Sequence, residues 1–544
     1  MQLLPAEATA RQMCACLRDG CPGRLRPAIA GRFALNQSAD FRFFRWSILA
    51  FLIAGLLIML NYGHTGNMIR FPDQTGIRGN QMKEKIVLIG AGSAMFTRGL
   101  VADLVKRGDP LDLALVDIDP QALEAAEKLS AKMVATRKAP VNITASIDRR
   151  KVLPGATAVI CTIGVGGRRA WEQDVFIPRK YGIFQPVGDT ACPGGTSRAL
   201  RMIPAMVDIA RDVLDICPKA LFFNYGNPMS ATCRGIRKAT GAPVIGLCHG
   251  VFDTARFLAW KLGALEKDRT MPRFGFSATG INHCTWYTDV TVDGKNELPG
   301  LLDIGGKILG QSVKYDELGT KFAEGGTLGK GETDPEGHSR FSWQLAALFG
   351  VYPGVGDRHV TEFFPRMTLG KGQYFGKTLG IDAYSFEATI AEGDRIYEEM
   401  KADALSNKPL GDDYFKRIGG EHEQVVEIID SIRRDNGRVY SANMANSGQV
   451  SNLMPDAVIE CPVRATSGGL VPVPRAPLPP PIAGIMNARF NWAEATVESA
   501  LEGSREKFVQ ALILDGAVDS MDTAGKLADE LLTAQAEYLP RFRK

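Results

Sequence analysis

The stretch KIVLIGAGSAMF, residues 85–96, decides the fold. Residues 86–89 form a short apolar run, and Gly90 and Gly92 follow it, a pattern that indicates a buried strand turning into a helix. Glycines at such a turn let the backbone approach a pyrophosphate, while the N-terminus of the next helix supplies N–H groups and partial positive charge. We therefore predict a nucleotide-binding loop at Gly90, Gly92 and Ser93.

The next apolar run, LDLALVDID at 111–119, supports this prediction because it places Asp117 at the end of a second strand. A carboxylate at that position can bind the hydroxyls of an adenosine ribose. It would repel the additional phosphate of NADP, so the sequence favours NAD as the cofactor. Met95 stands where the common pattern has a third glycine. The alternative is a glycine turn in an unrelated α/β protein, with Asp117 merely solvated.

Apolar strands alternate with helical segments from Met82 onward, which predicts a doubly wound parallel sheet of the Rossmann type over residues 82–277. Later segments are mixed: residues 279–295, TGINHCTWYTDVTVDGK, alternate like antiparallel strands around an Asp-Gly turn. We therefore expect a mixed α+β substrate and catalytic domain over residues 278–544. The predicted class is α/β, with the architecture of the lactate and malate dehydrogenases.

The composition is that of an ordinary globular enzyme or binding protein. The 544 residues are 45% hydrophobic and 23% charged, with a formal net charge of +4. Because no dense run of lysine and arginine occurs, we expect no nucleic-acid partner. The ten cysteines stand mostly alone, as reduced thiols inside cells do, so the predicted location is cytoplasmic.

Residues 1–81 differ from the rest of the chain and contain the apolar run WSILAFLIAGLLIML at 46–60. This run is shorter than the roughly 20 residues that span a bilayer, and it lies deep in the chain for a signal peptide. Three interpretations remain: a membrane anchor, an unusual targeting segment, or translated upstream sequence before a start at Met82. We favour the third because a complete domain begins directly after Met82, and we then expect no membrane association.

Polar side chains follow three later strands, and they are candidates for the reactive site. Asn227 lies in NYGNPMS, Cys248 and His249 lie in GLCHGV, and His283 lies in INHCTW. Ligands of open α/β sheets bind beyond the carboxyl ends of the strands, so these groups should meet there. A thiolate and an imidazole leave a metal with open positions for substrate oxygens. Taken singly, Cys248 could also be a small buried apolar residue, and His283 a core histidine.

A further cluster, GVGDRHVTEFFP, brings Asp357, Arg358 and His359 together within one short stretch. These residues could supply a general acid, a general base and a cation to the same site. The alternative is a salt-bridged loop without a chemical role.

Six motifs, in this order and spacing, resemble those of glycoside hydrolase family 4. They are GAGSAMF (90–96), VGDTACPGGTSRALR (187–201), NYGNPMS (224–230), GLCHGV (246–251), GINHCTW (280–286) and GDRHVTEFFP (356–365). The resemblance runs from about residue 85 to the C-terminal helices. It implies a glycosidase that uses NAD and a divalent metal, usually manganese, an exception to the two-carboxylate mechanism of most glycosidases.

The resemblance also implies a reaction path and residue roles. NAD oxidises the C3 hydroxyl of the sugar, a base removes the C2 proton, the aglycone leaves by elimination, water adds, and the hydride returns. Cys248 and His283 would hold the metal, and His249 would protonate the leaving group. Asp357 falls near the position of the C2 base. Asn227, Arg358 and His359 would bind the substrate.

The substrate is expected to be a terminal α-glycoside, with α-galactosides ahead of α-glucosides. The CHGV motif disfavours 6-phosphoglycosides. An α-galacturonidase or α-glucuronidase of the same family is the alternative, in which Arg358 would face the uronate carboxylate. A simple NAD-dependent 2-hydroxy acid dehydrogenase is the alternative of another class. The resemblance further implies a homodimer or homotetramer.

Overall fold

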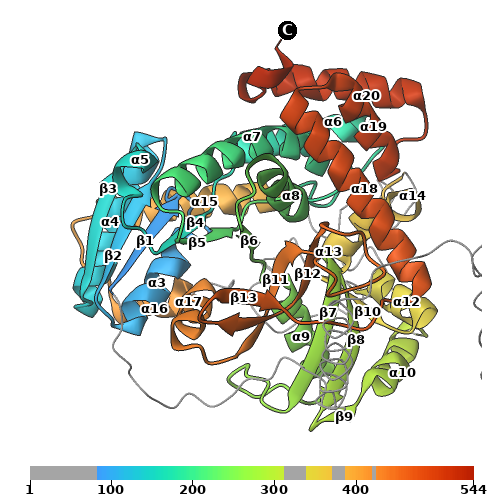
Figure 1. Ribbon diagram of the computed structural model, residues 1–544, viewed down its shortest axis with the longest axis horizontal. Helices are drawn as coiled ribbons and strands as arrows, with labels where there is room; N and C mark the ends of the chain where they lie inside the picture. The colour runs from blue at the N-terminus through green and yellow to red at the C-terminus, as the bar shows by residue number, and fades with distance from the viewer. Residues whose placement is uncertain (1–82, 311–338, 371–385, 419–423, 544) are drawn as a thin grey trace, which may run out of the picture. The chain divides into compact units, whose positions relative to one another are not determined.

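A computed structural model describes residues 83–310, 339–370, 386–418 and 424–543. Its strands form one 13-stranded sheet with the order β10-β8-β7-β12-β11-β6-β5-β4-β1-β2-β3, which Figure 1 shows. β13 pairs with β12, and β9 pairs with β8. The α/β class predicted from the sequence is confirmed.

Six strands form the parallel part of the sheet: β1 (Glu84–Ile89), β2 (Leu111–Val116), β3 (Val141–Ser146), β4 (Ala158–Cys161), β5 (Leu221–Asn224) and β6 (Ile245–Gly246). The central strands are almost continuously apolar because helices cover both of their faces. β3 lies at the edge, and its sequence VNITAS accordingly mixes apolar and polar residues. All six strands end at the same edge, where Gly90, Asp117 and Cys248 follow them.

The other strands are antiparallel: β7 (Phe274–Ile281), β8 (Cys284–Val292), β9 (Lys295–Asn296), β10 (Tyr352–Gly354), β11 (Val439–Ala445), β12 (Val458–Thr466) and β13 (Gly469–Pro472). They continue the parallel strands in the same sheet instead of forming a second one. The predicted domain boundary after residue 277 stays a prediction, and the sheet passes across it.

One row of paired residues joins the parallel and the antiparallel parts of the sheet. Gly246 of β6 pairs with Asn443 of β11, Asn443 pairs with Glu460 of β12, and Glu460 pairs with Gly280 of β7. Because β6 ends at Gly246 and β7 ends just after Gly280, the turn that follows β7 lies at the carboxyl edge of the parallel strands. The row therefore brings His283 to the edge that carries Cys248.

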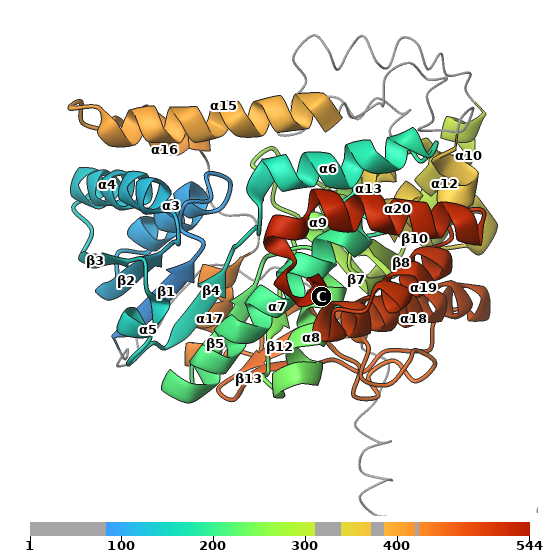
Figure 2. The same ribbon diagram turned by 90° about the horizontal axis from the view of Figure 1, so that it is seen from above.

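The helices are α3 (Thr97–Arg107), α4 (Pro120–Arg137), α5 (Arg149–Val152), α6 (Gly167–Lys180), α7 (Cys192–Ile216), α8 (Met229–Thr240), α9 (Gly250–Lys261), α10 (Leu298–Leu309), α12 (Arg340–Phe349), α13 (Asp357–Val360), α14 (Pro365–Thr368), α15 (Phe386–Leu405), α16 (Asp412–Ile418), α17 (Val425–Arg434), α18 (Pro480–Glu502), α19 (Arg505–Asp515) and α20 (Met521–Ala534). The C-terminal helices return to the first half of the chain, since α18 packs on α7 and α8, and α20 packs on α6. Figure 2 shows α15 running beside α4, another contact between distant parts of the sequence.

No described helix is long and apolar enough to cross a membrane. The apolar run at 46–60, on which the anchor and targeting interpretations depend, lies outside the described residues.

A buried ion pair fixes α7 against α6. Arg201 donates from Nη1 and Nη2 to the two carboxylate oxygens of Asp174 at 3.0 and 2.5 Å, and both side chains are fully buried. Gln535, which follows α20, donates to the same carboxylate at 3.2 Å. Burial raises the pKa of Asp174, although the Arg201 charge opposes this effect. Removal of the arginine would leave the carboxyl without its cation inside the core.

Replacing Arg201 with leucine should therefore cost about 3–5 kcal/mol of unfolding free energy. Denaturant unfolding of the full chain measures this loss. Arg211→Leu is the matched control, because Arg211 lies on the same helix and forms an exposed pair with Asp208 at 3.0 Å. Such a pair contributes about 0–1 kcal/mol. Equal losses in the two variants would contradict a structural role for the buried pair.

Candidate active site and metal centre

The glycine turn after β1 has the geometry of a nucleotide loop. Gly90 has a φ of +92°, and a Cβ there would lie 2.8 Å from the backbone nitrogen of Ile163, so only glycine fits. The Gly92 N–H donates to Asp117 Oδ2 at 2.8 Å. The Ser93 N–H donates to the Gly90 carbonyl at 3.0 Å. The structure thus brings together the four residues that we predict to bind the nucleotide, while their binding role stays a prediction.

His283 occupies a two-residue turn between β7 and β8. Ile281 pairs with Cys284, so Asn282 and His283 alone make the connection. His283 has a φ of +69°, a left-handed conformation that is uncommon outside glycine. Its side chain is buried, and burial lowers the pKa of the imidazole to about 4. The ring is therefore neutral near pH 7, as a metal ligand must be.

A single hydroxyl links His283 to Asp189. Thr190 Oγ1 donates to Asp189 Oδ1 at 2.7 Å and also lies 2.8 Å from His283 Nδ1. Which atom donates in the second contact depends on the tautomer of the imidazole. The hydroxyl thus ties the His283 ring to the Asp189 carboxylate.

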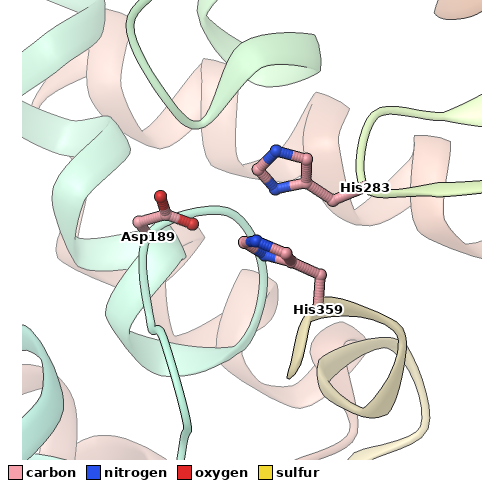
Figure 3. A group of neighbouring side chains, drawn as sticks. All are labelled: Asp189, His283 and His359. Carbon is pink, nitrogen blue, oxygen red and sulfur yellow. The ribbon is translucent and has the colours of Figure 1, made fainter. Parts of the chain in front are cut away.

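His359 and Asp189 complete a cluster with His283, which Figure 3 shows. One donor atom from each of the three residues lies within 4.8 Å of the others. The two imidazole rings are 4.0 Å apart between centroids, with an angle of 41°. Burial lowers the pKa of His359 well below its ordinary value, and Nδ1 of this ring is buried with no hydrogen-bond partner among the described residues. Two neutral imidazoles and a carboxylate are a donor set for a divalent cation.

Asn227 adjoins this cluster. It lies between β5 and α8, and its Nδ2 donates to Asp189 Oδ2 at 2.9 Å. The Asp189 carboxylate thus accepts one hydrogen bond on each oxygen, from Thr190 and from Asn227. These bonds hold the carboxylate in one orientation.

Cys248 and His249 follow β6 directly, immediately before α9. Both are partly buried, and Cys248 Sγ accepts a hydrogen bond from the Gly250 N–H at 3.4 Å. Cys248 is not one of the three residues whose donor atoms lie within 4.8 Å of one another. His249 Nε2 lies 3.7 Å from Asp253 Oδ2, and its charge opposes protonation of His283 and His359. His249 is therefore close enough to the cluster to influence it electrostatically.

Asp357 and Arg358 precede His359, but their side chains have other contacts. Asp357 is fully buried and accepts hydrogen bonds from the backbone N–H groups of Phe341 and Ser342 at 2.7 and 2.8 Å, in the first turn of α12. Negative charge at a helix N-terminus is stabilising, so these contacts favour a structural role. Arg358 donates to Thr389 Oγ1 at 3.1 Å. The catalytic role of Asp357 stays a prediction.

Glu362 supports the loop that carries Asp189. Its Oε1 accepts hydrogen bonds from the N–H groups of Val187 and Gly188 at 2.9 and 2.7 Å, whereas Oε2 is buried and has no partner in the part of the chain that the structure describes. Burial raises the pKa of Glu362 to about 8, and the nearby charge of Asp189 acts in the same direction. The carboxyl is thus largely protonated at neutral pH.

Comparison with known proteins identifies the family. The sequence model described as family 4 glycosyl hydrolase matches residues 85–264, and that of the family 4 C-terminal domain matches residues 278–518. The chain belongs to glycosyl hydrolase family 4. It is 30% identical to an α-galactosidase of Rhizobium meliloti over 84% of this chain and 89% of the relative. It is also 30% identical to an α-galacturonidase of Bacillus subtilis, over 80% and 93% of the two chains.

A protein of known structure has the same fold. It is a 6-phospho-α-glucosidase from gut microorganisms, solved in complex with NAD and Mn²⁺. The TM-score is 0.70 at 17% identity, over 84% of this chain and 99% of the other. The two family models confirm the family resemblance inferred from the six motifs.

Sequence reasoning missed two residues that the structure places at the centre of this family 4 site. Asp189 and Thr190 lie in VGDTACPGG, a motif that served only to carry the family resemblance. The available signal was an aspartate followed by a threonine, just before a helix whose first turn contains two glycines. His359 was assigned to substrate binding, but its ring packs against His283.

The raised pKa of Glu362 gives a pH-dependent stability. Between about pH 4.5 and pH 8 the folded protein holds a Glu362 proton that the unfolded chain has lost, so the contribution of this group to stability falls as pH rises through this range. One proton corresponds to a slope of about 1.4 kcal/mol per pH unit. Glu362→Gln keeps an oxygen acceptor but cannot ionise, so the slope of its stability against pH should be less negative than that of the wild type by about this amount.

Denaturant unfolding of both proteins at several pH values between 5 and 8 provides the measurement. Parallel stability curves for the variant and the wild type would contradict a protonated Glu362.

Proposed function

We propose that this family 4 glycosidase hydrolyses terminal α-glycosides, α-galactosides above all, with NAD and a divalent metal such as Mn²⁺. The observation that carries the proposal is the cluster of Asp189, His283 and His359, whose donor atoms lie within 4.8 Å of one another. It lies at the sheet edge that also carries the glycine turn and Asp117. A cytoplasmic location and a homodimer or homotetramer belong to the same proposal.

The residues present fit a divalent cation. Within the described ranges Nδ1 of His359 is buried without a partner, which is costly unless a ligand occupies the site. His283 Nδ1 lies 2.8 Å from Thr190 Oγ1, which also bonds Asp189, so the hydroxyl ties two of the proposed ligands together. His283, His359 and Asp189 would hold the metal, and the carboxylate suits Mn²⁺. Cys248 remains a proposed ligand from the sequence, beside this set.

The glycine turn fits a dinucleotide. The close approach at Gly90 leaves no side chain between the backbone and a pyrophosphate, and Asp117 is fixed by the Gly92 N–H. When bound, NAD takes up and returns a hydride, and the divalent cation acts as a Lewis acid toward substrate hydroxyls.

The chain's own residues would bind the sugar and move protons. Asn227, already oriented by Asp189, can hydrogen-bond a sugar hydroxyl. His249 is partly exposed, with 44% of its side chain accessible, so it can exchange protons with solvent and protonate the leaving oxygen. The base that removes the C2 proton is proposed to be Asp357. In that role it would take up the proton with a carboxylate whose two oxygens already accept hydrogen bonds from α12.

The direct test is hydrolysis of nitrophenyl α-galactoside, α-glucoside, α-galacturonide and α-glucuronide, each with and without NAD, Mn²⁺ and reductant. We expect cleavage of the α-galactoside that requires both NAD and Mn²⁺, with no net formation of NADH. Because Cys248 is a partly exposed thiol, reductant should preserve activity.

Two outcomes would contradict the proposal. Stoichiometric NADH from a 2-hydroxy acid without hydrolysis of any glycoside would assign the chain to the dehydrogenases. Hydrolysis that proceeds equally without NAD would contradict the redox mechanism.

One observation favours a uronide as the second candidate substrate. Arg198 of α7 donates from Nε to the Asn227 carbonyl at 3.1 Å, and its guanidinium lies 5.7 Å from the ring centre of Trp171. Within the described ranges its Nη1 and Nη2 have no hydrogen-bond partner. Burial, followed by the charge of Arg201, lowers the pKa of Arg198. Such a cation beside Asn227 could bind a carboxylate through two parallel hydrogen bonds.

Arg198→Met should distinguish the two substrates. If uronides bind there, KM for the α-galacturonide should rise about 10- to 100-fold, since hydrogen bonds to charged groups contribute about 1.5–3 kcal/mol. KM for the α-galactoside should change little. Arg211→Met on the exposed side of α7 is the control. Equal effects on both sugars would contradict a carboxylate-binding role for Arg198.

A further inference from the structure

The row that joins the two parts of the sheet contains buried polar side chains. Asn443 and Glu460 are cross-strand partners, and both are fully buried. Both polar atoms of the Asn443 side chain and Oε1 of Glu460 have no hydrogen-bond partner among the described residues. Apolar residues would satisfy a sheet at these positions at lower cost, so a stability role alone does not explain the carboxyl group.

The other carboxylate oxygen of Glu460, Oε2, is hydrogen-bonded to a residue next to the metal cluster. Its Oε2 accepts a hydrogen bond from Asn282 Nδ2 at 3.0 Å, and Asn282 is the other residue of the turn that carries His283. The backbone N–H of Asn282 also donates to Ser230 Oγ at 3.4 Å. Glu460 on β12 and Ser230 on α8 thus hold the turn from two sides.

His283 needs such support because its backbone is in a left-handed conformation and its ring must meet both Thr190 and the cluster. Outer partners of metal-binding histidines commonly determine ring orientation and metal affinity.

The fold maintains Glu460 at a cost. Burial raises the pKa of its carboxyl to about 7, while the hydrogen bond from Asn282 and the nearby charge of His249 partly oppose the shift.

We propose that Glu460 is a positioning residue for the metal centre: through Asn282 it fixes the turn that presents His283 to the cation. The inference rests on the proposed metal site, but it concerns His283, which belongs both to the observed cluster and to the Cys248–His283 pair expected from the sequence. It adds a residue that touches neither the metal nor the substrate.

The test compares Glu460→Leu with Glu460→Gln in the full chain. Leucine removes the acceptor at similar size, whereas the glutamine carbonyl can still accept from Asn282 Nδ2. We expect the leucine variant to raise the Kd for Mn²⁺, measured by electron paramagnetic resonance, about 10- to 100-fold. Its thermal midpoint should not fall and its Kd for NAD should not change. Glutamine should keep the Mn²⁺ affinity within about threefold of wild type.

Several results would overturn the inference. An unchanged Kd for Mn²⁺ in a folded Glu460→Leu variant would do so, and so would equal losses in the leucine and glutamine variants. If the leucine variant fails to fold, Asn282→Ala removes the donor instead and should show the same weakened binding.

A crystal structure of the variant separates this inference from the proposed function. Loss of the contact between Thr190 Oγ1 and His283 Nδ1 is expected whether or not a metal binds. Wild-type protein that binds no Mn²⁺ would refute the proposed metal site, whereas an unmoved His283 in the variant would refute the positioning role.

Discussion

The pairing of four residues, Gly246, Asn443, Glu460 and Gly280, is the constraint on which the rest of the site depends. Through this row the end of the parallel strand β6 is joined to the antiparallel strands β11, β12 and β7. A Cβ on Gly280 would lie 2.3 Å from the Cys284 carbonyl oxygen, so the tight turn after β7 has no room for a side chain there. A shift of one residue along any strand of the row would turn its side chains to the other face of the sheet and would move His283 away from Asp189.

The parallel part of the sheet was predictable because its evidence is local. An apolar run, two glycines and Asp117 lie within about 30 residues, and each of these features restricts the backbone by itself. The turn with His283 was also visible as a motif. Asp189 was not identified, because its partners come from NYGNPMS, INHCTW and GDRHVTEFFP, and no spacing rule connects these segments. Glu460 lies in AVIECPV, which has the composition of an ordinary buried strand. Asp357 was predicted as an acid or base, and the sequence does not show that α12 begins against its carboxylate.

The site collects polar groups that a stable core would avoid. His283, Glu362 and Glu460 are buried and His359 is partly buried, and desolvation shifts the pKa of each toward its neutral form. Such costs are tolerable because the surrounding scaffold is held by other means, including the Arg201–Asp174 pair and the C-terminal helices packed on α7. The contacts that stabilise the scaffold are thus made between helices, whereas the buried polar groups of the site lie at the edge of the sheet.

The lowered pKa values of His283 and His359 have a consequence for metal binding. Histidine ligands of ordinary basicity are partly charged at neutral pH and must lose protons when a cation arrives. Here burial lowers the pKa of both imidazoles, so both rings are already neutral near pH 7. An incoming cation therefore need not displace a proton from an imidazolium at either ring. Binding of the cation then depends little on the protonation of these two histidines at neutral pH.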